Sequence, residues 1–181
     1  MKKLYYSWKD IQGATYEIAR QIYKDNWRPD YIVGITRGGL IPAVMLSQYL
    51  GVPCETLKVS LRDGGECESN LWMAEQAFGY VNEELRGGSN TVVDPAYRKN
   101  ILIVDDINDT GATLAWIKKD WPSGCLPDNH VWSTVWHNNV RFAVITNNLS
   151  SKESVDYSVF EVNKAEEDCW LVYPWEEFWR G

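Results

Sequence analysis

Residues 101–113 read Ile-Leu-Ile-Val-Asp-Asp-Ile-Asn-Asp-Thr-Gly-Ala-Thr, and this stretch decides the fold. It opens with apolar, mostly β-branched residues, which are typical of a strand buried on both faces of a parallel sheet. Two adjacent carboxylates, Asp105 and Asp106, end this strand, and Asp109 leads into a turn before a helix predicted over about residues 112–119. Ligands of open parallel sheets bind beyond the carboxyl ends of the strands, so the stretch also predicts a binding site.

The polar half of this stretch combines two kinds of binding chemistry. The start of a helix binds anions, because its free N–H groups and the helix dipole both face outward. Neighbouring carboxylates accept hydrogen bonds from a vicinal diol or hold a hydrated divalent metal ion. Each residue taken singly is also explained as a helix cap or a solvated acid. The complete string after a buried strand instead favours a ligand with both a polyol and a phosphate, such as a ribose phosphate.

A second polar loop follows the strand predicted over residues 31–35. It reads Thr36-Arg37-Gly38-Gly39 and leads into a helix predicted over residues 41–50. Adjacent glycines let the backbone approach a ligand closely, and the guanidinium of Arg37 offers a planar fork of donors suited to a diphosphate. Taken alone, the loop is better explained as a glycine turn that carries a surface arginine.

The rest of the chain alternates between helix and strand patterns. This alternation predicts an α/β fold with a mostly parallel sheet flanked by helices, in a single domain that spans residues 1–181. Residues 62–99 form a long connection that we expect to be mobile, and residues 120–139 are irregular in pattern. The other predicted elements are a helix over residues 8–23 with Ser7 as its N-cap, strands over 55–60 and 141–146, a helix over 70–85, and short strand-like pieces over 155–179.

The composition argues against several classes of protein. The chain of 181 residues has 18 Lys and Arg against 25 Asp and Glu, and this net charge of −7 argues against a nucleic-acid partner. No apolar run reaches the length of a transmembrane helix, and the first residues lack the apolar core of a signal peptide, so we expect no membrane association. The four cysteines include no C-x-x-C pair, and we expect reduced thiols in a cytoplasmic protein.

The string at residues 101–113 resembles the phosphoribosyl pyrophosphate (PRPP) signature of type I phosphoribosyltransferases, an apolar strand followed by two acids and D-T-G-x-T. The resemblance implies an enzyme that transfers ribose 5-phosphate from PRPP to a nucleobase nitrogen and releases pyrophosphate, with Mg²⁺ as cofactor. It implies that Asp105 and Asp106 hold the ribose hydroxyls near Mg²⁺, with Asp106 as the metal-site residue, and that Asp109 is the general base facing the nucleobase. The 5-phosphate would lie on the loop formed by Asp109, Thr110, Gly111, Ala112 and Thr113.

The resemblance extends to two further segments. The loop at residues 36–39 resembles the family's pyrophosphate loop, in which a non-proline cis peptide is common, and this implies PRPP contacts for Arg37 and Gly38. Trp-Leu-Val-Tyr-Pro-Trp-Glu, starting at Trp170, resembles the hood strand of bacterial xanthine–guanine and hypoxanthine phosphoribosyltransferases. It implies a small hood over about residues 155–181, in which Trp170 packs on a purine and Leu171 contacts the base. Members of this family are usually dimers or tetramers, so we expect a homo-oligomer.

One departure from the family pattern concerns the base. These purine enzymes carry a lysine after the strand that precedes the hood, where it recognises the 6-oxo group, whereas this chain has Asn147 and Asn148 there. We expect one of these amides to contact the edge of the base. An enzyme with an amide there should reject adenine less strongly than an enzyme with a lysine, because an amide can both donate and accept. Lys152 is an alternative donor. Two other functions stay open, a PRPP-binding regulatory protein and a phosphoribosyltransferase for another base.

Overall fold

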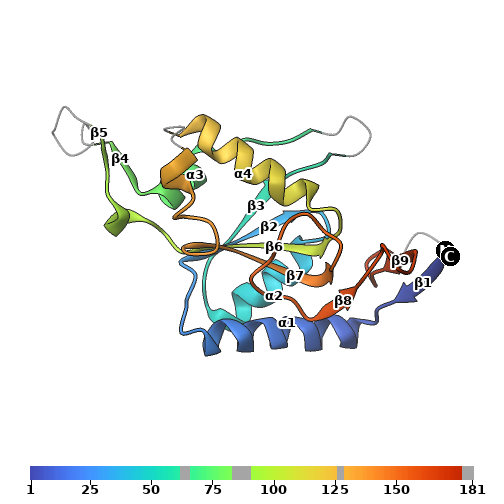
Figure 1. Cartoon of the computed structure of the whole chain (residues 1–181). Helices are drawn as coiled ribbons and strands as arrows, with labels where there is room; N and C mark the ends of the chain where they lie inside the picture. The colour runs from blue at the N-terminus through green and yellow to red at the C-terminus, as the bar shows by residue number, and fades with distance from the viewer. Residues whose placement is uncertain (62–65, 83–90, 126–128, 177–181) are drawn as a thin grey trace.

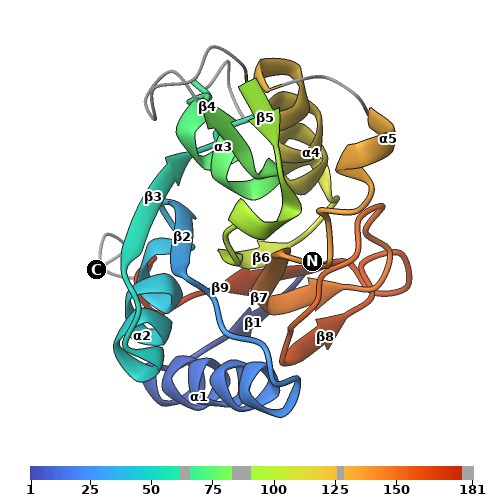
Figure 2. The same cartoon turned by 90° about the vertical axis from the view of Figure 1, so that its left-hand side faces the viewer.

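A computed structural model shows an α/β fold in three layers (Figures 1 and 2). It describes residues 1–61, 66–82, 91–125 and 129–176. The central layer is a five-stranded sheet in the order β3-β2-β6-β7-β8, and every neighbouring pair in it is parallel. The predicted mostly parallel sheet flanked by helices is confirmed. Its strands are β2 (Tyr31–Thr36), β3 (Cys54–Lys58), β6 (Ile101–Asn108), β7 (Val140–Asn148) and β8 (Phe160–Val162).

Helices cover both faces of the sheet because successive strand residues point to opposite sides. Ile32 of β2 lies in the core layer beneath the sheet, whereas its neighbour Val33 lies in the layer above it. Figure 1 shows α1 and α2 below the sheet and α3 and α4 above it. These helices are α1 (Trp8–Lys24), α2 (Leu40–Leu50), α3 (Leu71–Phe78) and α4 (Ala112–Gly124).

The ends of the helices follow the predictions in part. The N-cap predicted at Ser7 is confirmed: its hydroxyl accepts a hydrogen bond from the Asp10 N–H at 3.2 Å, and the Asp10 carboxylate accepts from the Ser7 N–H at 2.7 Å, which completes a capping box. The helix α4 continues to Gly124 instead of ending near residue 119, because Trp121 is fully buried against the core. The helix expected over residues 70–85 stops at Phe78, where Gly79 adopts a left-handed φ of 80°.

The described parts of the long connection at residues 62–99 pack on the body of the protein. In α3, Met73, Ala74, Ala77 and Phe78 are buried in the upper core layer. The antiparallel strands β4 (Tyr80–Asn82) and β5 (Thr91–Val93) follow, with a short 3-10 helix at Pro95–Tyr97. Residues 62–65 and 83–90 lie outside the described residues. Part of the connection that we expected to be mobile, and the end of the helix that we expected over residues 70–85, fall on them. Later in the chain, α5 (Asn129–Trp132) occupies part of the segment that we expected to be irregular.

A second, two-stranded sheet joins the two ends of the chain. In it β1 (Lys2–Tyr5), which the sequence did not predict, runs parallel to β9 (Cys169–Val172), with Leu4 opposite Leu171. We call β1, β9 and the connection at residues 163–168 the hood. We expected the hood to span about residues 155–181. In the structure, β8 of this range belongs to the central sheet, and β9 is the strand that pairs with β1. Residues 177–181 lie outside the description.

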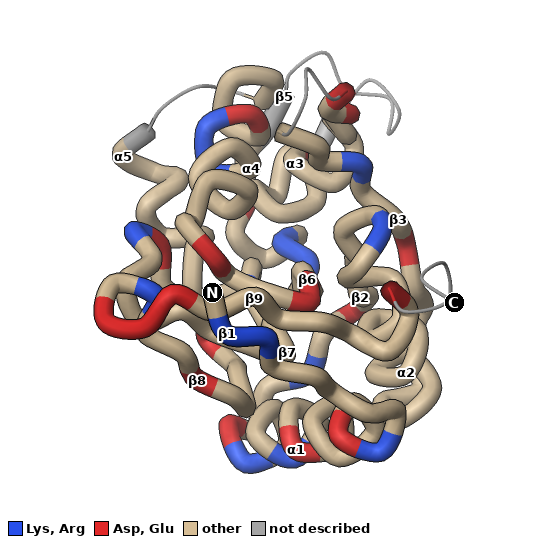
Figure 3. The backbone as a smooth tube through the Cα atoms, turned by 90° about the vertical axis from the view of Figure 1, so that its right-hand side faces the viewer, with Lys and Arg blue, Asp and Glu red and all other residues tan. Residues whose placement is uncertain are grey.

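The surface carries charges of both signs. Figure 3 shows Lys and Arg interspersed with Asp and Glu, for example along α1. This pattern differs from the continuous basic face with which proteins usually grip a phosphate backbone. None of the described helices is long and apolar enough to cross a membrane.

Candidate active site

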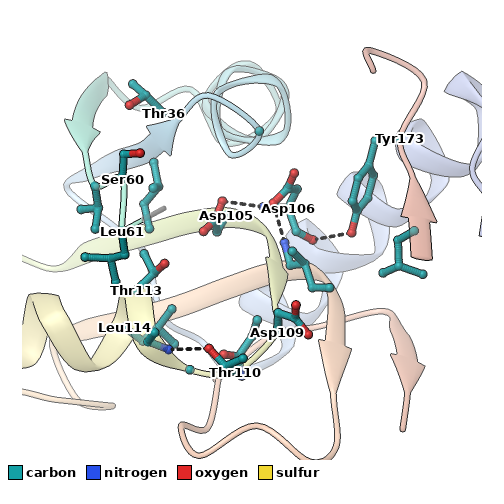
Figure 4. A pocket seen from close by; sticks show the side chains of 18 of the residues that line it. Thr36, Ser60, Leu61, Asp105, Asp106, Asp109, Thr110, Thr113, Leu114 and Tyr173 are labelled. Atoms are coloured by element: carbon teal, nitrogen blue, oxygen red, sulfur yellow. Dashed lines mark hydrogen bonds between the residues drawn. The ribbon is translucent and has the colours of Figure 1, made fainter. Parts of the chain in front are cut away.

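A pocket of about 430 Å³ lies between the carboxyl ends of the central strands and the hood. Its volume suits a small organic ligand. Figure 4 shows Asp106 between Asp105 and Tyr173, and a dashed line joins it to the Tyr173 hydroxyl. The lining comes from the loop after β2, the segment after β3, the turn from β6 to α4, and the hood with the residues that follow it: Ile35, Thr36, Gly38, Val59, Ser60, Leu61, all residues from Asp105 to Leu114, Lys164, Trp170, Leu171, Tyr173 and Glu176.

The two adjacent acids lie inside β6, because the strand that we expected to end at them continues through Asn108. The Asp106 N–H donates to the Asp105 carboxylate at 2.9 Å, and the Ile107 N–H donates to the Asp106 carboxylate at 2.8 Å. Burial raises the pKa of Asp105, and the neighbouring charge of Asp106 raises it further; burial also raises the pKa of Asp106. A cation or hydroxyl donors bound here would offset the cost of two adjacent buried charges.

The glycine loop after β2 lies directly against this acidic pair. A Cβ atom on Gly38 would collide with the Asp106 carboxylate, and one on Gly39 would collide with the Val104 carbonyl. The peptide bond between Thr36 and Arg37 is cis. Gly38 lines the pocket, whereas the Arg37 side chain is exposed and is absent from the described lining.

The turn from β6 into α4 forms one end of the pocket. Gly111, the N-cap residue of α4, has a left-handed φ of 88° and no side chain with which to cap the helix. The Thr110 hydroxyl accepts a hydrogen bond from the Ala112 N–H at 3.3 Å. Figure 4 shows Thr110 and Thr113 at this end of the pocket. The backbone N–H groups and hydroxyls of the turn are therefore suited to bind an anion.

The opposite end of the pocket combines charge with aromatic surface. The Lys164 ammonium forms an ion pair with the Asp109 carboxylate at 3.0 Å, and both side chains are partly buried. Trp170, which is 39% exposed, and the buried Leu171 line the same pocket from β9. This end can stack a flat ring and hydrogen-bond its edge.

Comparison with known proteins shows to which family this chain belongs. The family model described as "Phosphoribosyl transferase domain" matches residues 3–177. The chain belongs to the phosphoribosyltransferase family. It is 29% identical to a hypoxanthine-guanine phosphoribosyltransferase of Schizosaccharomyces pombe, over 96% of this chain and 89% of that protein. It is 27% identical to a xanthine-guanine phosphoribosyltransferase of Cereibacter sphaeroides, over 97% of this chain and 87% of the relative. A purine phosphoribosyltransferase structure from Pyrococcus horikoshii is 26% identical with a TM-score of 0.61, covering 98% of this chain and 96% of that one.

The structure corrects our expectation for the base end of this phosphoribosyltransferase. Neither Asn147 nor Asn148 lines the pocket, and the exposed Lys152 does not line it either. The side-chain amide oxygen of Asn147 accepts a hydrogen bond from the Asn108 side-chain amide at 2.9 Å, and the Asn148 side chain is buried. The amine that reaches the pocket comes from Lys164, six residues before Trp170.

Among the residues that sequence reasoning missed are three that line the phosphoribosyltransferase pocket from residues 163–176, namely Lys164, Tyr173 and Glu176. The Tyr173 hydroxyl donates to the Asp106 carbonyl at 3.0 Å and is hydrogen-bonded to the Thr146 hydroxyl at 3.1 Å. Glu176 accepts a hydrogen bond from the Tyr173 N–H at 3.0 Å. Tyr173 and Glu176 belong to the hood motif and could have been found from it. Lys164 has no motif around it, so only the tertiary structure locates it.

Proposed function

We propose that this chain is a purine phosphoribosyltransferase that transfers ribose 5-phosphate from PRPP to a ring nitrogen of a free purine. The products are a nucleoside 5′-monophosphate and pyrophosphate, as in nucleotide salvage. The proposal rests on one observation: the two acids of β6 and the anion-binding turn share a single pocket with Trp170 and Leu171. Such a pocket can hold a phosphorylated ribose and a flat base in contact, which converts a bimolecular reaction into an effectively unimolecular one.

The ribose end of this proposal uses the residues of the β6–α4 segment. The 5-phosphate binds the turn from Asp109 to Thr113, through backbone N–H groups and the two threonine hydroxyls. Asp105 and Asp106 accept hydrogen bonds from the ribose hydroxyls. Gly38 brings the backbone of its loop to the pyrophosphate, and we keep Arg37 as a pyrophosphate ligand, which requires its exposed side chain to turn inward.

The chemical step breaks the bond between ribose C1′ and the pyrophosphate oxygen, which leaves with the bonding electron pair. A ring nitrogen of the base forms the new bond to C1′, and the base loses a ring N–H proton to Asp109, the general base. Positive charge that develops on the ribose is offset by the acids of β6 and by Asp109. Trp170 stacks on the base and holds it in line with C1′.

Magnesium fits the donors on the PRPP side of the pocket. Mg²⁺ typically binds one or two carboxylates together with substrate phosphates and water, and Asp106 presents a carboxylate with no cation beside it among the described residues. We therefore assign Mg²⁺ to Asp106, with Asp105 adjacent, and when bound the metal would neutralise charge on the departing pyrophosphate.

The test is pyrophosphate release from PRPP and Mg²⁺ with a panel of hypoxanthine, guanine, xanthine, adenine, uracil and orotate. We expect activity with the 6-oxo purines, and loss of activity when the metal is chelated. Strong preference for uracil or orotate would overturn the purine assignment. Binding of PRPP without pyrophosphate release for any base would support the regulatory alternative instead.

A further inference from the structure

The base end of the pocket contains a hydrogen-bond donor and an acceptor side by side. The Lys164 ammonium and the Asp109 carboxylate lie 3.0 Å apart, and both line the pocket. They reach it from different directions, since Asp109 follows β6 and Lys164 belongs to the connection between β8 and β9. No sequence motif places a lysine there, so some other feature of the structure must fix the position of this pair.

That feature is the side chain of Asn148, the last residue of β7, which is only 5% exposed. Its amide N–H donates to the backbone carbonyl of Asp109 at 2.9 Å. Its amide oxygen accepts from the backbone N–H of Lys164 at 3.0 Å. The same oxygen also accepts from Ser150, at 3.2 Å from the N–H and 2.9 Å from the hydroxyl.

One buried amide therefore holds the backbones of both members of the pair. Asparagine suits this place because its side chain carries a donor and an acceptor on one small planar group. A carboxylate of the same shape would lose the donor and face the Asp109 carbonyl with a second oxygen. An apolar side chain would leave buried polar groups of both loops without partners.

The Lys164–Asp109 pair is complementary to one hydrogen-bonding pattern on the edge of a nucleobase. Lys164 can only donate and the ionised Asp109 can only accept, so together they match a ring carbonyl oxygen next to a ring N–H. A base with an exocyclic amino group in place of the carbonyl would direct a donor at the ammonium, and the ammonium N–H that faces the base would have no acceptor there. Discrimination of this kind is large, because a buried polar group without a partner is costly.

We propose that Asn148 is a positioning residue for acceptor recognition: its buried amide holds Lys164 beside Asp109, and Lys164 selects bases with a carbonyl next to a ring N–H. The proposal rests on the proposed function and replaces our expectation that an asparagine contacts the base and tolerates adenine. Asn148 acts through its neighbours and does not touch the base.

The test measures kcat/KM and KM for hypoxanthine and adenine, KM for PRPP, and Tm in four variants. Lys164→Gln keeps a polar side chain of similar length and removes the charge, and Lys152→Gln makes the same change at an exposed lysine outside the pocket. Asn148→Asp keeps the shape and removes the amide donor. Asn138→Asp makes that change at an exposed asparagine just before β7, where the amide donates to the Thr134 carbonyl.

We expect Lys164→Gln to lower kcat/KM for hypoxanthine about 10- to 100-fold, with adenine changed less than about threefold. Asn148→Asp should lower the hypoxanthine-to-adenine ratio in the same direction and raise KM for hypoxanthine, with KM for PRPP within about threefold of wild type. Both control variants should retain the wild-type ratio.

Three outcomes would separate the possibilities. An active wild type whose base ratio is unchanged by Lys164→Gln overturns the role of Lys164. If Lys164→Gln changes the ratio but Asn148→Asp lowers Tm and all rates equally, then Asn148 is structural and not a positioning residue. If Asn148→Asp fails to fold, Asn148→Ser supplies the same comparison. A wild type without pyrophosphate release for any base contradicts the proposed function itself, independently of these variants.

Discussion

Asp109 takes part in two sets of interactions at once. Its carboxylate pairs with Lys164, while its backbone carbonyl accepts the Asn148 amide. It also begins the turn that leads to Thr110 and the start of α4. This single residue therefore connects the turn before α4 to the end of the pocket that contains Lys164, and the roles proposed for it should be separable from those proposed for Asp106.

The first prediction separates these two acids. Asp109→Asn should lower kcat by about 10²–10⁴-fold, because it removes the general base and keeps the shape of the side chain. Asp106→Asn should instead raise the apparent KM for Mg²⁺ and PRPP, because the diol and the metal lose a charged ligand. Steady-state kinetics with varied PRPP, Mg²⁺ and hypoxanthine measures both effects. Equal, modest changes in PRPP affinity in both variants would contradict the division of roles.

A second prediction concerns the glycine loop. Gly38→Ala places a methyl group against the Asp106 carboxylate, so the loop must move off β6 and KM for PRPP should rise at least about tenfold. Gly13→Ala is the matched control, because a Cβ atom there meets no atom within 4 Å on the exposed side of α1. The control should raise the free energy of unfolding by about 0.5–1 kcal/mol. Unchanged PRPP kinetics in Gly38→Ala would contradict the close-approach role.

At the scale of elements, the site depends on how the hood attaches to the central sheet. Tyr173, just after β9, reaches the carbonyl of Asp106 in β6 and the hydroxyl of Thr146 in β7. Its ring also stacks on Trp175, with ring centroids 4.9 Å apart. Burial raises the pKa of Tyr173 above its usual value, so this hydroxyl stays protonated and able to donate.

A third prediction tests this attachment. Tyr173→Phe removes the hydroxyl and leaves the Asp106 carbonyl without its donor, which should lower the free energy of unfolding by about 1–2 kcal/mol. KM for the base should rise at the same time, because β9 carries Trp170 and Leu171. Tyr23→Phe, at a tyrosine that is 84% exposed, is the control and should alter neither quantity. Chemical denaturation and base titrations measure the two effects; a Tyr173→Phe variant as stable as the control would rule out the attachment.

At the scale of the whole molecule, the two ends of the chain close the pocket together. Lys3 in β1 pairs with Trp170 in β9, and Tyr6 stacks on Phe160 with ring centroids 4.8 Å apart. In the proposed function, the body of the protein supplies the PRPP side of the pocket from the ends of β2 and β6. The hood supplies the base side, so damage to the hood should affect the two substrates unequally.

The fourth prediction is that deleting residues 2–5 raises KM for the base more than KM for PRPP. The deletion removes β1, and β9 loses the backbone hydrogen bonds of its parallel partner. Lys2→Ala is the control, because it removes only an exposed ion pair with Glu167 at 3.1 Å and should change stability by less than about 1 kcal/mol. Equal changes in both KM values would argue that β1 serves general stability alone.

The sequence alone located the segments to which we assign PRPP. The apolar strand that begins at residue 101, the two acids and the turn before α4 are contiguous, and each follows from local rules on apolar runs, glycine and helix starts, although the strand continues beyond the acids to Asn108. The glycine loop after β2 was found in the same way. Parallel strands align their carboxyl ends at one edge of the sheet, so these two contiguous segments had to meet.

Only the tertiary structure decided the base side. Asn148 follows the expected strand, and its amide has the donor and the acceptor needed to bind a base edge. In the structure, this amide instead forms hydrogen bonds with the backbones of Asp109 and Lys164. Lys164 takes the place in the pocket that we had assigned to an asparagine, and β1 pairs with β9 across nearly the whole length of the chain. The physical reason is that the direction of a loop side chain is set by hydrogen bonds to residues distant in sequence, which local propensity and periodicity do not encode.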